Sequence, residues 1–195
     1  LFRTMAPDIG AHVHGVANGV DCVFFDPAIE TPSPYADGQT KLVFTGAMDY
    51  WANVDAVCWF ADDVFPRIRS ALPECEFVIV GANPAPEVVK LGDRAGITVT
   101  GRVVDVRPYI AHATISVAPL RVARGIQNKV LEAMALEKAV VATPQAMEGI
   151  AAVDGEEVFV VEDAAEFADR VLSLASAASA SDRQSAGHRA RRRVL

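Results

Sequence analysis

The stretch ARGIQNKVLEAMALEKAVVATP, residues 123–144, joins a helix pattern to a strand pattern through a short charged turn. Segment 127–136 has helical periodicity, and the apolar run 139–142 is typical of a buried strand. Asn128, Lys129 and Glu132 lie along one flank of the predicted helix, in its first turns. Packing alone does not require three polar groups there, so this flank is a candidate for function.

On both sides of residues 123–144, short apolar runs alternate with segments of helical periodicity. The runs lack polar alternation, as expected of strands covered on both faces. The predicted strands are 12–16, 42–45, 77–80, 98–100, 115–118, 139–142 and 158–161. The predicted helices are 54–72, 86–94, 106–113, 127–136 and 164–177, the first capped by Asn53 with Asp55 near its positive end. The alternation predicts an α/β fold with a Rossmann-like, doubly wound parallel sheet.

Composition excludes several classes of protein. The chain has 195 residues, 51% of them hydrophobic, and a net charge of −7, which favours one globular domain and argues against nucleic-acid binding. Cys22, Cys58 and Cys75 have no CxxC spacing and the four histidines are scattered, so we expect free thiols and no metal site. No apolar run is long enough for a transmembrane segment and no signal peptide heads the chain, which predicts a cytoplasmic protein.

Three glycines follow predicted strands at the edge where ligands bind in doubly wound sheets. Gly46, Gly81 and Gly101 would let a ligand approach the backbone, although glycine also makes tight turns. Their equivalent positions indicate a shared crevice. The motifs GxGxxG, GxxxxGK[ST] and GxSxG are absent, so the usual dinucleotide, P-loop and hydrolase interpretations fail.

The opening stretch itself suits an anion. Gly125 and Gln127 are expected to begin a helix whose free backbone N–H groups face a phosphate. Lys129 would add positive charge, and the Glu132 carboxylate could accept two hydrogen bonds from a vicinal diol. The alternative is a Lys129–Glu132 surface pair without function, and the residues alone leave both open.

Five motifs carry a family resemblance in order and spacing: ANGVD (17–21), VFTGAMDYWANVDAVCWF (43–60), FVIVGANP (77–84), VTGRVVDVRPYIAHATISVAPL (99–120) and KVLEAMALEKAVVATPQAMEGI (129–150). Together they resemble the carboxy-terminal, donor-binding half of a family 4 glycosyltransferase, whose GT-B architecture has two Rossmann-like domains. The resemblance covers about residues 12–162. The GAMDYW and GIQNKVLEAMA variants look closest to sugar transferases associated with exosortase/PEP-CTERM exopolysaccharide loci.

The resemblance implies retaining transfer of a sugar from a UDP- or GDP-type nucleotide-sugar, without a metal cofactor. The acceptor would be a glycan or a lipid-linked glycan, bound by an amino-terminal domain that this sequence lacks. Such a fragment would bind donor weakly and transfer nothing. A cytoplasmic location with peripheral contact to the inner membrane would suit a lipid-linked acceptor.

Individual roles also follow from the resemblance. Glu132 matches the second glutamate of the family's Glu–seven residues–Glu motif, which holds the ribose. The expected donor-binding residues are Gly46 and Ala47 beside the phosphates, Gly81, the base-reading Gly101, Arg102 and Val103, the diphosphate-facing Gly125, Ile126 and Gln127, and Asn128, Lys129 and Glu132. The expected catalytic residues are Arg124, Lys129 and Glu132.

Two positions depart from the family pattern. Arg124 stands where the first glutamate of the motif is usual, and the loop GAMDYWANVD lacks the usual Arg and Lys. Arg124 and Lys129 could supply the missing phosphate charge. Arg124 also keeps open the alternative of a non-catalytic nucleotide or nucleotide-sugar binding module. A receiver-like signalling domain fits poorly, because Pro119, Leu120 and Arg121 follow strand 115–118 instead of a phosphoacceptor.

The predicted organisation has four parts. Residues 1–16 are expected to connect to the amino-terminal domain, and residues 17–40, rich in Pro and Gly, to form an interdomain linker. Residues 41–178 form the nucleotide-sugar-binding domain. Residues 179–195 are a basic tail that begins a closing helix, with a solvated and partly frayed face.

Overall fold

A six-stranded parallel sheet forms the centre of the computed structural model, which describes residues 18–36 and 38–195. The sheet order is β3-β2-β1-β4-β5-β6. The strands are Lys41–Thr45 (β1), Glu76–Val80 (β2), Ile97–Gly101 (β3), Ile115–Ala118 (β4), Val140–Ala142 (β5) and Phe159–Val160 (β6). The six predicted strands from residue 42 onward are thus confirmed, and the order is that of a doubly wound fold. The predicted strand 12–16 lies outside the described residues.

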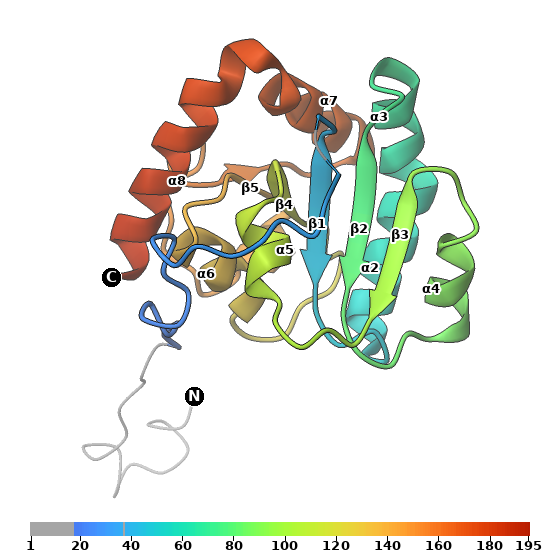
Figure 1. Ribbon diagram of the computed structural model, residues 1–195, viewed down its shortest axis with the longest axis horizontal. Helices are drawn as coiled ribbons and strands as arrows, with labels where there is room; N and C mark the ends of the chain where they lie inside the picture. Colours follow the sequence, from blue (N-terminus) through green and yellow to red (C-terminus); the bar gives the residue numbers. More distant parts are fainter. Residues whose placement is uncertain (1–17, 37) are drawn as a thin grey trace, which may run out of the picture.

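Helices cover both faces of this sheet (Figure 1). The helical elements are α2 (Trp51–Trp59), η2 (Phe60–Val64), α3 (Phe65–Ala71), α4 (Pro86–Leu91), α5 (Arg107–Ala111), α6 (Asn128–Ala135), η3 (Pro144–Met147), α7 (Ala164–Ala175), η4 (Ala177–Ser179) and α8 (Ala180–Val194). One face carries α2, α3, α4 and α7, and the other carries α5 and α6, with α8 packed on α6. The carboxyl ends of the strands point to the lower side of Figure 1, where the loops after β1, β2 and β3 meet.

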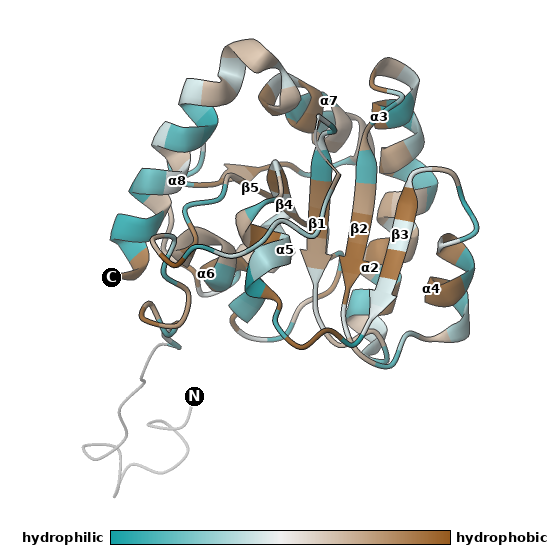
Figure 2. Cartoon of the chain, viewed as in Figure 1, coloured by the Kyte–Doolittle hydropathy of each residue, from teal (hydrophilic) through white to brown (hydrophobic). Residues whose placement is uncertain are grey.

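Burial on both faces explains why the inner strands are mostly apolar. Every residue of β1, β4 and β5 is buried. Phe44 and Phe77 pack with Phe60 under α2 and its continuation, and the Phe60 and Phe77 rings lie 4.6 Å apart. Figure 2 shows this as brown strands inside a shell of helices with teal outer surfaces. The hydrophobic effect therefore favours burial of the sheet's apolar side chains between the helices, and the charged groups lie at the ends of the strands.

A charged pair fixes the register at the amino ends of β1 and β2. Lys41 is paired with Glu76 in the ladder, and the Lys41 ammonium lies 2.5 Å from the Glu76 carboxylate. The Lys41 side chain is only 4% exposed, so a slip of one residue would leave a buried charge without its partner.

The helix predicted at 54–72 differs from the observed one in two respects. It begins earlier, at Trp51 after Tyr50, so the prediction of Asn53 as its cap is wrong, and its first turn holds no acidic residue, contrary to the expected position of Asp55. Its middle is the π-helical segment η2, which ends two residues before Pro66. Proline cannot donate to the carbonyl four residues earlier and its ring clashes with it, so a wider turn accommodates Pro66.

The segment before β1 packs along α5. The Tyr35 hydroxyl donates to the Tyr109 carbonyl at 2.7 Å, and the Arg107 guanidinium lies 4.0 Å from the centre of the Phe24 ring. His112 Nε2 lies 2.6 Å from the Thr31 carbonyl oxygen. These contacts attach the described part of the predicted linker to the sheet domain.

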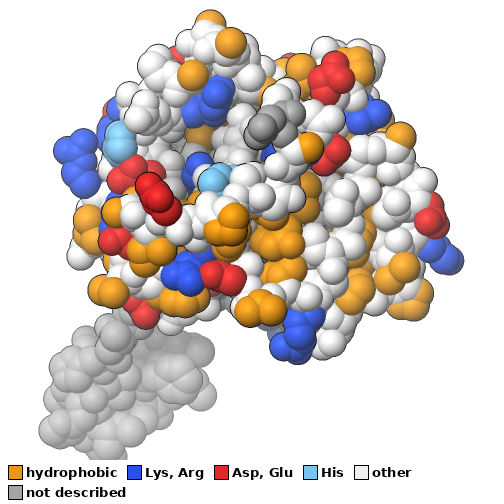
Figure 3. Space-filling view, in the orientation of Figure 1, with side chains coloured by type: hydrophobic (Ala, Val, Ile, Leu, Met, Phe, Trp, Pro, Cys, Tyr) orange, Lys and Arg blue, Asp and Glu red, His pale blue; other side chains and the backbone are white. Residues whose placement is uncertain are grey.

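The basic tail forms the predicted helix with an exposed outer face, but the helix continues to Val194, so the expected fraying is not seen. Arg191 donates to the Phe25 carbonyl at 3.0 Å, and Arg193 lies 3.0 Å from the Glu157 carboxylate. Ala186, Gly187 and Ala190 are buried against the domain. Figure 3 shows basic and acidic side chains intermixed on the edge formed by α8. Arg191 and Arg193 are thus held by a carbonyl and a carboxylate of the domain itself.

Gly187→Ala should destabilise the protein, because a Cβ at this position would overlap the carbonyl group of Glu137. Alanine gains about 1 kcal/mol in helix propensity over glycine, but forced overpacking typically costs about 1–3 kcal/mol. We expect a net loss in the free energy of unfolding, measured by urea denaturation. Ser185→Ala, at an exposed position of the same helix, is the matched control. A variant as stable as wild type would contradict the tight packing of α8.

Candidate functional site

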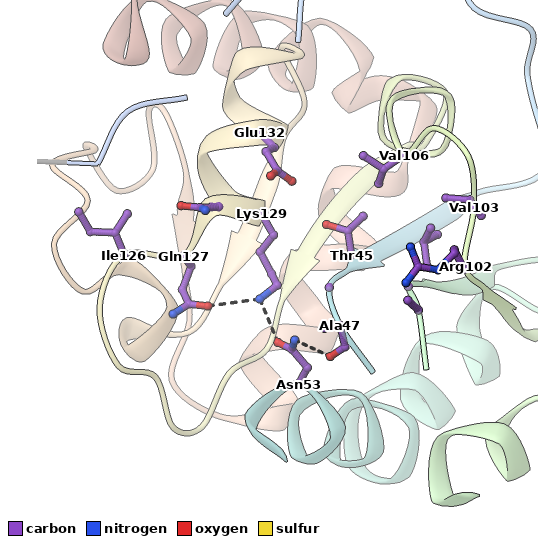
Figure 4. Close-up of a pocket in the computed structure, with 15 residues that line it drawn as sticks. Thr45, Ala47, Asn53, Arg102, Val103, Val106, Ile126, Gln127, Lys129 and Glu132 are labelled. Carbon is purple, nitrogen blue, oxygen red and sulfur yellow. Dashed lines mark hydrogen bonds between the residues drawn. The ribbon is translucent and has the colours of Figure 1, made fainter. Parts of the chain in front are cut away.

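An open cleft of about 480 Å³ lies at the carboxyl ends of β1 and β2. One wall comes from α6 and the segment before it, and the opposite wall from the loop after β3 (Figure 4). The lining residues are Thr45, Gly46, Ala47, Asn53, Val80, Gly81, Ala82, Arg102, Val103, Val106, Ile126, Gln127, Asn128, Lys129 and Glu132. The cleft is therefore where a doubly wound sheet ordinarily binds a ligand.

The floor of the cleft is made by two loops in direct backbone contact. A Cβ on Gly81 would overlap the Gly46 carbonyl oxygen, so this glycine allows the two strand ends to approach each other. Met48 N–H donates to the Ala82 carbonyl at 2.8 Å, and Ala85 N–H donates to the Met48 carbonyl at 3.0 Å. Close packing of backbone, as well as access for a ligand, thus requires small residues here.

Lys129 is the central polar group of the cleft. Its ammonium donates to Asn53 Oδ1 at 3.0 Å and to Gln127 Oε1 at 3.2 Å, and lies 5.1 Å from the centre of the Phe44 ring. Asn53 Nδ2 in turn donates to the Ala47 carbonyl at 2.9 Å. Figure 4 shows this chain of contacts crossing from α6 to the loop after β1.

Burial sets the protonation of the two charged groups on α6. It lowers the pKa of Lys129 to about 8, with the Glu132 carboxylate acting in the opposite direction. Burial raises the pKa of Glu132, and Lys129 opposes that shift. Both side chains are half-buried on the same helical flank, one turn apart. An anion in the cleft would therefore meet a poorly solvated ammonium group.

The start of α6 adds hydrogen-bond donors to this wall. Gln127 is the N-cap and the helix begins at Asn128, three residues after Gly125, which has a φ of 76°. Within the described chain, the backbone N–H groups of Asn128 and Lys129 have no protein acceptor. The predicted helix start is thus present, but Gly125 makes the turn before it instead of opening the helix.

The structure brings most of the predicted site residues to one cleft. Those that line it are Gly46, Ala47, Gly81, Arg102, Val103, Ile126, Gln127, Asn128, Lys129 and Glu132. Gly101 and Gly125 do not line it, although each is next to a residue that does. Arg124 is exposed and also lies outside the lining, whereas Arg102 is exposed on the wall opposite Lys129.

Sequence reasoning missed five lining residues: Thr45, Asn53, Val80, Ala82 and Val106. Four of them are small or apolar and carry no chemical signal. Asn53 was assigned to a helix cap, a role that asparagine often has. Its actual partner, Lys129, is 76 positions away in the chain, which no local pattern could reveal.

In residues 18–36 and 38–195 no group of three or more His, Cys, Asp or Glu side chains could hold a metal ion. None of the helices described there is both long and apolar enough to cross a membrane.

Comparison with known proteins places this geometry in a family. Residues 39–177 match the family described as "Glycosyl transferases group 1". No curated protein matches the chain.

Solved structures show the same fold at low identity. A glycosyltransferase from Rickettsia africae ESF-5 has a TM-score of 0.74 and 17% identity, covering 95% of this chain and 52% of that one. Anabaena Alr3699/HepE, in complex with UDP and glucose, has a TM-score of 0.72 and 13% identity, covering 94% and 52%. The carboxy-terminal domain of LpcC from Francisella tularensis has a TM-score of 0.66 and 21% identity, covering 90% and 96%. The chain therefore spans about half the length of the first two and has the fold of a GT-B carboxy-terminal domain.

The burial of Lys129 should be measurable as a pH dependence of stability. Its pKa of about 8 lies below the ordinary value of 10.5, so the protonated form destabilises the fold and this penalty disappears as pH rises between these values. Over this interval, the free energy of unfolding of wild type should rise relative to Lys129→Met by on the order of 1–3 kcal/mol. Urea denaturation at several pH values measures it, with exposed Lys90→Met as the control. A difference that stays constant with pH would contradict the burial of the ammonium.

Proposed function

The chain belongs to the glycosyl transferases group 1 family, and from this membership we propose that its cleft binds the nucleotide-sugar donor of a glycosyltransferase. The observation that carries the proposal is the pairing of Lys129 and Glu132 on one wall of the cleft, beside free N–H groups of the α6 start. A cation with amide donors suits a diphosphate, and a carboxylate suits a ribose diol.

The donor then has one orientation in the cleft. Its diphosphate lies at the amino end of α6, where the Asn128 and Lys129 amides and the Lys129 ammonium converge. The ribose lies one helical turn further on, within reach of the Glu132 carboxylate. The base occupies the opposite wall, beside Arg102 and Val103. This orientation accounts for every charged side chain that lines the cleft.

A nucleoside diphosphate is the ligand class favoured by this chemistry. The Anabaena structure with a similar fold holds UDP and glucose, which supports a UDP-type donor. A GDP-type donor fits the same diphosphate and ribose contacts, because these contacts do not involve the base.

The finer proposals rest on the motifs quoted from the sequence. We propose a family 4 enzyme that retains anomeric configuration, acts without a metal ion and is closest to exosortase-associated transferases of exopolysaccharide synthesis. Glu132 is the only carboxylate among the described lining residues, which supports charge neutralisation by Lys129 instead of a metal. The acceptor, a glycan or lipid-linked glycan, would be held by a second domain, and the whole enzyme would work in the cytoplasm or against the inner membrane. On its own this chain would bind donor without transferring sugar.

One observation favours a second candidate function. Arg124 replaces the expected first glutamate and is exposed outside the cleft lining, which suits a nucleotide-sugar binding module without catalysis. A longer protein that contains this chain and transfers sugar would exclude the binding module.

Binding is tested by a thermal-shift panel of UDP, GDP, ADP and TDP on the purified chain. A ligand that binds only the folded state raises the melting temperature by an amount that increases with the logarithm of its affinity. We expect one nucleotide to stabilise the protein more than the others do, since Arg102 and Val103 would contact the base directly. The absence of stabilisation by all four nucleotides, at concentrations up to the millimolar range, would refute the proposed function.

Glu132→Ala should weaken binding of the preferred nucleoside diphosphate by about tenfold or more, because charge-assisted bonds to the ribose are lost. The 2′-deoxy nucleotide should bind wild type more weakly than the ribonucleotide, and Glu132→Ala should no longer distinguish the two. Calorimetry measures all four affinities. Glu87→Ala, an exposed carboxylate on α4 outside the cleft, should keep the discrimination. Equal discrimination in Glu132→Ala would remove Glu132 from the ribose site.

A further inference from the structure

Asn53 links three separate segments at the floor of the cleft. Asn53 is the third residue of α2 and is 5% exposed. Its Oδ1 accepts from Lys129 of α6, and its Nδ2 donates to the Ala47 carbonyl in the loop after β1. One amide side chain thus satisfies a cation on one side and a backbone acceptor on the other, as Figure 4 shows.

The contacts of Lys129 leave it suited to a ligand. Two of its three N–H donors go to the neutral oxygens of Asn53 and Gln127. Within the described chain no carboxylate oxygen contacts the ammonium; Glu132 acts on it only at a distance, and Arg102 lines the opposite wall. The positive charge is therefore oriented but not neutralised, and the third donor remains for an anion.

We propose that Asn53 is the positioning residue of the donor diphosphate site: it fixes the Lys129 ammonium over the loop that begins at Gly46. The inference rests on the proposed function, since it assigns the anion to the diphosphate of a nucleotide-sugar. It also answers how a loop without the family's usual Arg and Lys holds phosphate. The cation comes from α6, and the loop contributes an acceptor of the amide that holds it.

The size and chemistry of the neighbouring positions fit this role. A Cβ on Gly46 would lie 2.7 Å from Asn53 Nδ2 and 3.4 Å from Lys129 Cε, so glycine leaves the space that both side chains fill. An aspartate at position 53 would neutralise Lys129 and repel the Ala47 carbonyl. An alanine would remove the Asn53 donor from the Ala47 carbonyl and the Asn53 acceptor from the Lys129 ammonium. Only a side chain with both an acceptor and a donor satisfies both sides.

The first arm of the test needs no donor. The protein has four lysines, Lys41, Lys90, Lys129 and Lys138, so ¹³Cε-labelled lysine gives few signals, and Lys129→Arg assigns the one of interest. Titration of the ligand-free protein should give a lower Lys129 pKa in Asn53→Ala and a higher one in Asn53→Asp than in wild type. Asn83→Gly, which tolerates the φ of 54° at an exposed asparagine of the neighbouring loop, should leave it unchanged. An unchanged Lys129 pKa in both Asn53 variants would overturn the inference.

The second arm measures UDP and GDP affinity by calorimetry. Asn53→Ala should bind about tenfold more weakly, since Lys129 is no longer held. Asn53→Asp should also bind more weakly despite its more readily protonated lysine, because the carboxylate cancels the charge. A purely structural role would not move the two pKa values in opposite directions while lowering both affinities.

The two arms separate the possible failures. Wild type that binds neither nucleotide, with both pKa responses intact, refutes the diphosphate site and the proposed function, while the Asn53–Lys129 contact stands. Wild type that binds, with Asn53 variants of wild-type affinity, overturns the positioning role alone. Asn53→Ser, which keeps a hydroxyl in the buried position, replaces Asn53→Ala if that variant does not fold, and the same lower pKa is expected.

Discussion

The structure depends on a parallel sheet whose inner strands are buried on both faces. Because the side chains of β1, β4 and β5 are all covered, charged side chains occur only at the ends of these strands. The two ends use their polar groups differently. At the amino end, Lys41 and Glu76 neutralise each other and fix the register. At the carboxyl end, Lys129 is held by neutral amides, so that its charge is available to a ligand.

Lys41 and Lys129 differ in their partners: Lys41 pairs with a carboxylate, whereas Lys129 donates to neutral amide oxygens. A buried charge that serves stability has a carboxylate partner, because removing it from water otherwise destabilises the fold. Among the described residues no carboxylate contacts Lys129, and burial lowers its pKa to about 8. A binding anion supplies the missing partner, so the unfavourable burial in the free protein becomes attraction in the complex. A destabilised group inside a cleft is for this reason a functional signal.

Sequence reasoning predicted the elements and one wall of the cleft, because both are local patterns. Apolar runs mark buried strands, and Asn128, Lys129 and Glu132 stand out on a helix that packing would make apolar on that flank. It missed contacts between distant segments. Asn53 looked like a helix cap because its partners, Ala47 and Lys129, meet it only in the folded sheet. The helix at 179–195 was predicted, but its packing on the domain was not, because its arginines indicate a solvated face; Gly187, a small residue packed on Glu137, is the informative position.

The relative strengths of the cationic groups decide how the cleft holds a negative ligand. An exposed ion pair contributes about 0–1 kcal/mol, which limits Arg102, and a helix amino terminus contributes about 0.3–1 kcal/mol. Two unit charges about 4 Å apart interact with about 4 kcal/mol at an effective dielectric of about 20, which applies best to the poorly solvated Lys129. Lys129 therefore contributes most of the attraction and the α6 amides most of the direction. Since Lys129 carries this term in the proposed complex, the residue that orients it would have more influence on donor binding than a further charge at the rim.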